Sequence, residues 1–218
     1  MICWNIWNAR NNLVWNGKVQ SNIRIIQTAE DMLLQWQQAK RLQQCHHNTR
    51  EFPLIQKWQK PNEGWFKCNV DAALLNQYNQ IGYGCVIRDD QGEFIVARNG
   101  VLNGPMNPAL AEALSCKEAL SWLKNLSYNK VIVELDAQQL VHALQDSQED
   151  LSYFGSIVDD CKILSKDLGD CTFLFAKRSA NQVAHSLAKA TGSMPDRGVW
   201  FFNPLFFISH VLALDNHE

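Results

Sequence analysis

Apolar and polar residues alternate along residues 65–71, and this period of two predicts a β-strand with one buried face. Asp71 comes last and falls on the polar face, so an acidic side chain is expected where the strand ends. A second strand is predicted at residues 131–135, because a β-branched run of this length is typical of strands buried on both faces. Asp136 follows it directly, which predicts a second carboxylate at a strand end.

Between these strands, an Ala- and Leu-rich stretch predicts a helix that ends at about Leu126. Asn107 supplies an N-cap, and Pro108 suits the first helical position. On this helix Glu112 shares one stripe with Cys116, Ala119 and Leu123. Burying a carboxylate without a partner is costly, so Glu112 is a candidate functional residue.

The remaining pattern indicates three regions. Residues 1–63 are predicted to form a helical extension and a linker, residues 64–190 a sheet domain, and residues 191–218 a C-terminal tail. Within the sheet domain, residues 137–144 and 151–168 are amphipathic and predict helices, and residues 172–176 predict an edge or near-edge strand. A capping box at residues 179–182 predicts the start of the last helix.

The three acidic residues are expected to meet, because parallel sheets build sites beside the carboxyl ends of neighbouring strands. Asp71, Glu112 and Asp136 would then offer the hard oxygen ligands that suit Mg²⁺ or Mn²⁺. Two such ions roughly 4 Å apart can activate a water and stabilise a phosphate under attack. The set therefore predicts a catalytic site that hydrolyses a nucleic-acid backbone.

Each carboxylate also has a purely structural interpretation. Residues 136–139 form an acceptable capping box, so Asp136 taken alone fits a helix cap. Asp71 can simply open a polar loop at residues 74–80, and Glu112 can be solvated. The joint order of the three residues on strand, helix and strand favours the metal site.

Five short segments occur in order along residues 64–190: 67–73 (KCNVDAA), 82–89 (GYGCVIRD), 111–113 (AEA), 134–138 (ELDAQ) and 178–188 (RSANQVAHSLA). Together they resemble the type 1 ribonuclease H domain family, in particular the version carried by plant retroelement-derived, reverse-transcriptase-like proteins. The resemblance implies an α/β, ribonuclease H-like fold, with a five-stranded mixed sheet flanked by helices. It also implies Mg²⁺-dependent cleavage of the RNA strand of an RNA–DNA hybrid.

By position, the resemblance makes Asp71, Glu112 and Asp136 the metal ligands and catalytic residues. It makes Gln138 a contact to the hybrid in the minor groove and Asn181 the residue that opens the last motif, a further position at the nucleic acid.

His185 stands where the family usually has a fourth carboxylate, four residues after that asparagine. Imidazole can ligate a metal through one nitrogen, but it brings no negative charge and prefers softer ions than Mg²⁺. The second ion is therefore expected to be held less tightly. A packed or surface histidine on the last helix is the alternative interpretation.

Charge and cysteine content narrow the expected partners and compartment. Residues 64–190 carry 11 Lys and Arg against 15 Asp and Glu, so phosphate binding is expected to rely on the metal and on Lys177 and Arg178. The 7 cysteines form no C-x-x-C pair, which favours reduced thiols in an intracellular protein, without distinguishing nucleus from cytoplasm. The apolar stretch at residues 199–214 is too short to span a bilayer comfortably, so no membrane role is expected.

The sequence therefore predicts a metal-dependent endoribonuclease that cleaves the RNA strand of RNA–DNA hybrids, weakened by His185. The alternative hypothesis is a catalytically decayed, retroelement-derived module that binds nucleic acid or a protein. An unrelated doubly wound domain for a small ligand is disfavoured, because the chain has no Gly-rich phosphate loop. Early tryptophans at positions 4, 7, 15 and 36 predict a helical segment that packs on its own domain or, alternatively, docks a partner, and the sequence does not identify a protein partner.

Overall fold

The computed structural model describes residues 57–193 and 198–216, together with separate residues between positions 6 and 29. The chain divides into two compact units, Met1–Leu54 and Ile55–Glu218. In the first unit most of the separate described residues are helical, among them Ile6, Ala9 and Ala29. The rest of the predicted N-terminal helices, including all four early tryptophans, lies outside the described residues.

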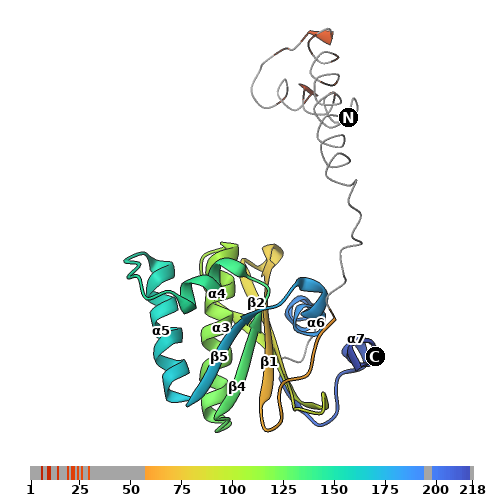
Figure 1. The fold of residues 1–218 in the computed structure, drawn as a ribbon. Coiled ribbons are helices and arrows are strands. Elements are labelled where there is room, and N and C mark those ends of the chain that lie inside the picture. The colour runs from red at the N-terminus through yellow and green to blue at the C-terminus, as the bar shows by residue number, and fades with distance from the viewer. Residues whose placement is uncertain are drawn as a thin grey trace, which may run out of the picture. The chain divides into compact units, whose positions relative to one another are not determined.

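A mixed sheet of six strands forms the centre of the second unit, in the order β5-β4-β1-β2-β3-β6 (Figure 1). The strand β1 pairs in parallel with β4 and antiparallel with β2, and β4 pairs in parallel with β5. The bounds are β1 (Phe66–Leu75), β2 (Gln80–Arg88), β3 (Phe94–Leu102), β4 (Lys130–Leu135), β5 (Asp170–Phe175) and β6 (Val199–Phe201).

The predicted α/β class, with a mixed sheet flanked by helices, is confirmed, and the sheet has one strand more than predicted. The additional strand β6 pairs antiparallel with β3 at one edge and comes from the segment predicted as a tail. Three residues are too few for an alternating pattern to show in the sequence. At the other edge, β5 agrees with the strand predicted at residues 172–176.

Helices cover both faces of the sheet (Figure 1). The helices on one side are α3 (Pro108–Asn125), α4 (Gln138–Gln145) and α5 (Tyr153–Asp167), and those on the other are α6 (Gln182–Ala190) and α7 (Phe206–Asn216). The larger core packs Cys68 and Val70 of β1 against α3, whereas the smaller core lies under α6 and α7 and includes Val86, Leu187 and Ile208. No helix in the described part of the chain is both long and apolar enough to cross a membrane.

Glycines of β2 let α6 lie close to the sheet. A Cβ atom added at Gly84 would stand 2.5 Å from the backbone nitrogen of Ala188 and 2.6 Å from the carbonyl oxygen of Ala184. Side chains do not pack at such distances against backbone, so glycine is required here for the approach. Gly84 pairs with Asp71 of β1, and α6 therefore lies over the residue that the sequence marks as catalytic.

Arg88 of β2 contacts both the segment that precedes β1 and the helix α7. Its side chain is 1% exposed, and its Nη1 donates to Asp215 of α7 at 2.8 Å. The guanidinium also lies 3.4 Å from the ring centroid of Trp58, which precedes β1. A buried cation that is both paired and stacked holds its neighbours firmly, so residue 58 and α7 pack as parts of the second unit.

Two predicted helix starts have different outcomes. Asn107 caps α3 as predicted, because its side chain accepts a hydrogen bond from the backbone of Leu110. The capping box predicted at residues 179–182 is wrong: α6 begins at Gln182 without a side-chain cap, and Ser179 lies in a short 3₁₀ helix, Arg178–Ala180. The side chain of Asn181 binds a neighbouring strand instead.

Candidate metal centre

Asp71 lies inside β1, which continues to Leu75. The prediction that it closes the strand is wrong, because antiparallel pairing with β2 extends β1 beyond it. The parallel partner β4 stops earlier, and its last pair with β1 joins Leu135 to Val70. Asp71 is therefore the first residue of β1 beyond the carboxyl end of β4. Asp136 follows β4 directly, at the same level of the sheet.

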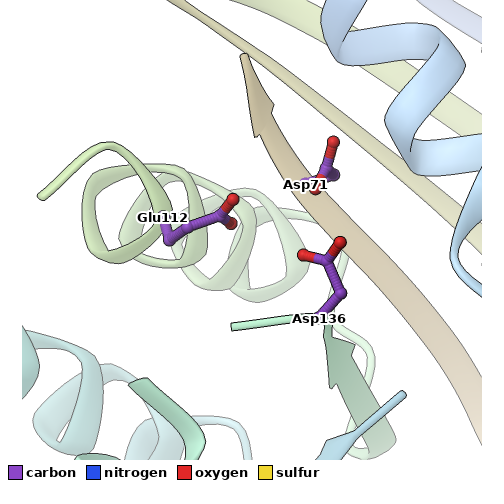
Figure 2. Close-up of side chains that lie close together, drawn as sticks. All are labelled: Asp71, Glu112 and Asp136. Carbon is purple, nitrogen blue, oxygen red and sulfur yellow. The ribbon is translucent and has the colours of Figure 1, made fainter. Parts of the chain in front are cut away.

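Glu112 completes a group of three carboxylates (Figure 2). It lies in the first turns of α3 and points toward Asp71 and Asp136. One oxygen from each of the three residues lies within 4.8 Å of the other two. The convergence predicted from the sequence is thus present in the fold. Asp136 does not cap α4, since Ala137 holds that position and no side-chain cap bond is formed.

Two of the carboxylate oxygens are buried without a hydrogen-bond partner among the described residues. They are Asp71 Oδ1 and Glu112 Oε2, and the Asp71 residue is only 1% exposed. An unpaired buried carboxylate oxygen is costly, and a divalent cation placed among the three residues would satisfy both atoms. An all-carboxylate donor set suits Mg²⁺ or Mn²⁺ better than softer ions. The residues present therefore fit the predicted cofactor.

Burial and the closeness of the three carboxylates also raise the pKa values of Asp71 and Glu112. Burial, the charges of Glu112 and Asp136 and a hydrogen bond with Asp136 raise the pKa of Asp71 to about 9, against a partial opposing effect of Arg178. Burial and the charge of Asp136 raise the pKa of Glu112 to about 8, although a hydrogen bond from the Ala72 backbone opposes the rise. Like charges in a poorly hydrated place favour protonation unless a cation neutralises them.

His185 lies next to the carboxylate group without belonging to it. Its Nδ1 is 2.7 Å from Asp71 Oδ2, and Arg178 Nη2 is 3.1 Å from its Nε2. Burial, followed by the positive charges of Arg178 and Lys189, lowers the pKa of His185. These effects disfavour the protonated imidazole beside Asp71, and the predicted role as a fourth ligand stays a prediction.

Asn181 has a position that the sequence did not indicate. Its side chain is buried, and Nδ2 donates to the carbonyl oxygen of Val70 at 2.9 Å. The Asn181 side chain is only 1% exposed and serves the packing of α6 on β1, and its predicted role at the nucleic acid stays a prediction. The bond fixes the start of α6 beside Asp71, and with it the place of His185.

The other predicted contacts to nucleic acid lie on the surface around the carboxylates. Gln138 is exposed at the start of α4 and lines a groove of about 390 Å³, which it shares with Glu112 and with Asn107 at the start of α3. Lys177 and Arg178 are both exposed, and Arg178 is close enough to influence the pKa of Asp71. The amide of Gln138 thus lies on the Glu112 side of the carboxylates, and the cation of Arg178 lies on the Asp71 side.

Sequence reasoning missed the residues that hold this geometry. Asn69 on β1 donates to Glu134 of β4 at 2.8 Å and accepts from Arg88 of β2 at 3.0 Å, which links three strands just below the site. Gly84 admits α6. The spacing of Gly82 and Gly84 on one face of a strand is a signal of close backbone approach that could have been used.

Comparison with known proteins places the chain in a family. The family model described as reverse transcriptase-like matches residues 69–191. The fold is similar to ribonuclease H1 from the halophilic archaeon Halobacterium salinarum NRC-1, with a TM-score of 0.53 and 16% identity over 59% of this chain and 97% of that one. No curated protein matches the chain.

A second similar structure is LC11-RNase H1, isolated from compost by a metagenomic approach, with a TM-score of 0.53 and 17% identity over 59% of this chain and 96% of that one. The same protein in complex with an RNA/DNA hybrid gives a TM-score of 0.52, with 16% identity over the same shares of both chains. The family match covers more than half of the chain and includes all three carboxylates. The chain therefore belongs to the reverse transcriptase-like family and has the α/β fold of ribonuclease H.

Proposed function

We propose that this protein is a metal-dependent endoribonuclease that cleaves the RNA strand of RNA–DNA hybrids. One observation carries the proposal: Asp71, Glu112 and Asp136 converge within 4.8 Å, with two buried oxygens unpaired. The family match and the similarity to a ribonuclease H1 that was solved with an RNA/DNA hybrid support the choice of substrate.

In this proposal each carboxylate has a defined task. Asp71 offers Oδ1 from the middle of β1, Glu112 offers Oε2 from α3, and Asp136 reaches the same point from the end of β4. When bound, Mg²⁺ or Mn²⁺ supplies an activated water and neutralises charge on the phosphate. The carboxylates hold the ion where the groove lined by Gln138 opens, so that the strand to be cut passes over them.

His185 is proposed to occupy the fourth ligand position of this site. Its Nδ1 lies 2.7 Å from Asp71 Oδ2, so the imidazole would be a neighbouring ligand of an ion held by Asp71. A neutral nitrogen donor favours Mn²⁺ over Mg²⁺. We therefore expect activity that is weaker with Mg²⁺ than with Mn²⁺.

The second candidate is a catalytically decayed module that binds nucleic acid. It is favoured by His185, which replaces the expected anionic ligand, and by Arg178 Nη2, which lies 2.8 Å from His185 Nδ1 and brings positive charge close to the carboxylates. In that case hybrids would bind in the groove without being cut.

A cleavage assay separates the two candidates. A hybrid labelled on either strand is incubated with the protein and Mg²⁺, Mn²⁺ or EDTA, and Asp136→Asn serves as the blocked control. The first candidate requires metal-dependent fragments from the RNA strand only, and none with Asp136→Asn. Binding of the hybrid without fragments under all conditions would favour the decayed module.

Origin and location are finer points of the same proposal. A source in a plant retroelement and an intracellular place of action are in keeping with the proposed reaction, and both remain predictions. Transcript mapping and localisation of a tagged full chain in cells would test them.

A further inference from the structure

A groove lies at the tip of the β1–β2 hairpin, at the far end of α6 from Asn181. It measures about 460 Å³ and is lined by residues 74–78 of the hairpin and by Lys189, Gly192 and Ser193. Its size is within the range of pockets that hold small organic groups. Leu74 and Leu75 give it an apolar side, and Lys189 gives it a positive charge.

Two side chains of this groove have no partner in the described part of the chain. Tyr78 is 58% exposed and makes no hydrogen bond or ring contact there. Lys189 is exposed and forms no ion pair with any described acidic residue. An exposed aromatic ring and a free ammonium group beside an apolar side are the elements of a stacking site for a base with a contact for its phosphate.

The groove lies within a few nucleotides' reach of the candidate metal centre, along β1 and α6. Lys189 lies one helical turn after His185 on α6, and its charge is felt at that imidazole. Leu75 is four residues beyond Asp71 on β1, a distance of about 13 Å for extended backbone. A strand leaving the carboxylates along α6 therefore reaches the groove after a small number of nucleotides.

We propose that this groove binds an unpaired nucleotide of the substrate, with Tyr78 stacking on the base and Lys189 contacting the phosphate. The inference rests on the proposed function for its substrate. It adds that the preferred substrate is a hybrid whose strand continues beyond the duplex, because only an unpaired base offers a free face to an aromatic ring.

The chain offers matched controls. Tyr153 on α5 is 57% exposed, nearly the same as Tyr78, and lies outside the groove. Lys166, also on α5, is exposed and can be compared with Lys189. The variants are Tyr78→Ala, Tyr78→Phe, Lys189→Gln, Tyr153→Ala and Lys166→Gln, each in full-length protein that also carries Asp71→Asn to prevent cleavage.

Fluorescence anisotropy measures binding to a blunt RNA–DNA hybrid and to four hybrids of the same duplex with a short overhang, at either end of either strand. We expect at least one overhang to tighten binding. Tyr78→Ala should remove that gain, a loss of about 5- to 100-fold for one stacked base, and Tyr78→Phe should keep it. Lys189→Gln should reduce the slope of log affinity against log salt concentration for the overhang hybrid by about 1, the amount expected for one lost phosphate contact.

The outcome for the groove can be told apart from the outcome for the proposed function. The affinity for the blunt hybrid tests hybrid binding, on which the proposed function depends, and the additional affinity for the overhang hybrid tests the groove. Equal affinity for blunt and overhang hybrids would overturn the inference. It would also be overturned if Tyr78→Ala weakened both kinds of hybrid equally, or no more than Tyr153→Ala does.

Discussion

Asp71→Asn should stabilise the metal-free protein, and the gain should grow with pH. The carboxyl of Asp71 has a pKa of about 9 in the folded protein against an ordinary value of 3.8. A raised pKa contributes stability below pH 3.8, and this contribution is lost as the pH rises toward 9. Asn cannot ionise, so the variant does not undergo this loss.

The size of the effect follows from the pKa shift. Each pH unit above the ordinary pKa lowers the free energy of unfolding of the parent by about 1.4 kcal/mol. At pH 7 Asp71→Asn should therefore be more stable than the parent by up to about 4 kcal/mol. The side-chain amide of Asn can still form a hydrogen bond with His185 Nδ1 in either tautomer, which keeps that contact. Near pH 4 parent and variant should therefore be nearly equal in stability.

Urea unfolding in EDTA at several pH values between 5 and 9 measures the difference. Asp160→Asn is the control, because it makes the same change in a half-exposed ion pair with Lys117, which is worth at most about 1 kcal/mol. Mg²⁺ should stabilise the parent more than Asp71→Asn, since the ion binds the folded carboxylates. A difference that does not vary with pH in EDTA would refute the reasoning, because neither burial nor the neighbouring carboxylates would then raise the pKa of Asp71.

Three further changes test the surroundings of the site. His185→Asp should raise Mg²⁺-supported cleavage and reduce the preference for Mn²⁺, measured as rates on one hybrid, and an unchanged Mg²⁺ rate would place residue 185 outside the metal shell. Neutralising Lys177 and Arg178 together should weaken hybrid binding for every sequence and flatten its salt dependence, whereas an unchanged slope would remove both from the interface. Gly84→Ala should lower the free energy of unfolding by about 1–3 kcal/mol, because its Cβ meets the backbone of α6. Gly198→Ala, whose nearest contact is an ordinary 3.7 Å, should change it little, and equal effects of the two would argue against a tight approach of α6.

The sequence by itself determined the candidate metal ligands and most of the elements. Alternation along β1, the β-branched run of β4 and the Asn-Pro start of α3 are local signals, because they depend on backbone periodicity and on caps formed within a few residues. Glu112 could be singled out since a charge on an apolar helical stripe conflicts with burial. The three carboxylates were identified for these reasons, and the fold brings them together as expected.

Tertiary structure decided how the site is held. The place of Asp71 within β1 depends on where β4 stops pairing, which no residue of β1 reveals. Asn181 offers the same amide to a helix cap or to a distant carbonyl, and only packing of α6 on β1 selects Val70. Asp136 taken alone fits a helix cap, and only the fold places the like charges of Asp71 in β1 and Glu112 in α3 beside it. Contacts between residues far apart in the sequence leave no periodic signal, so these features became visible only in the folded chain.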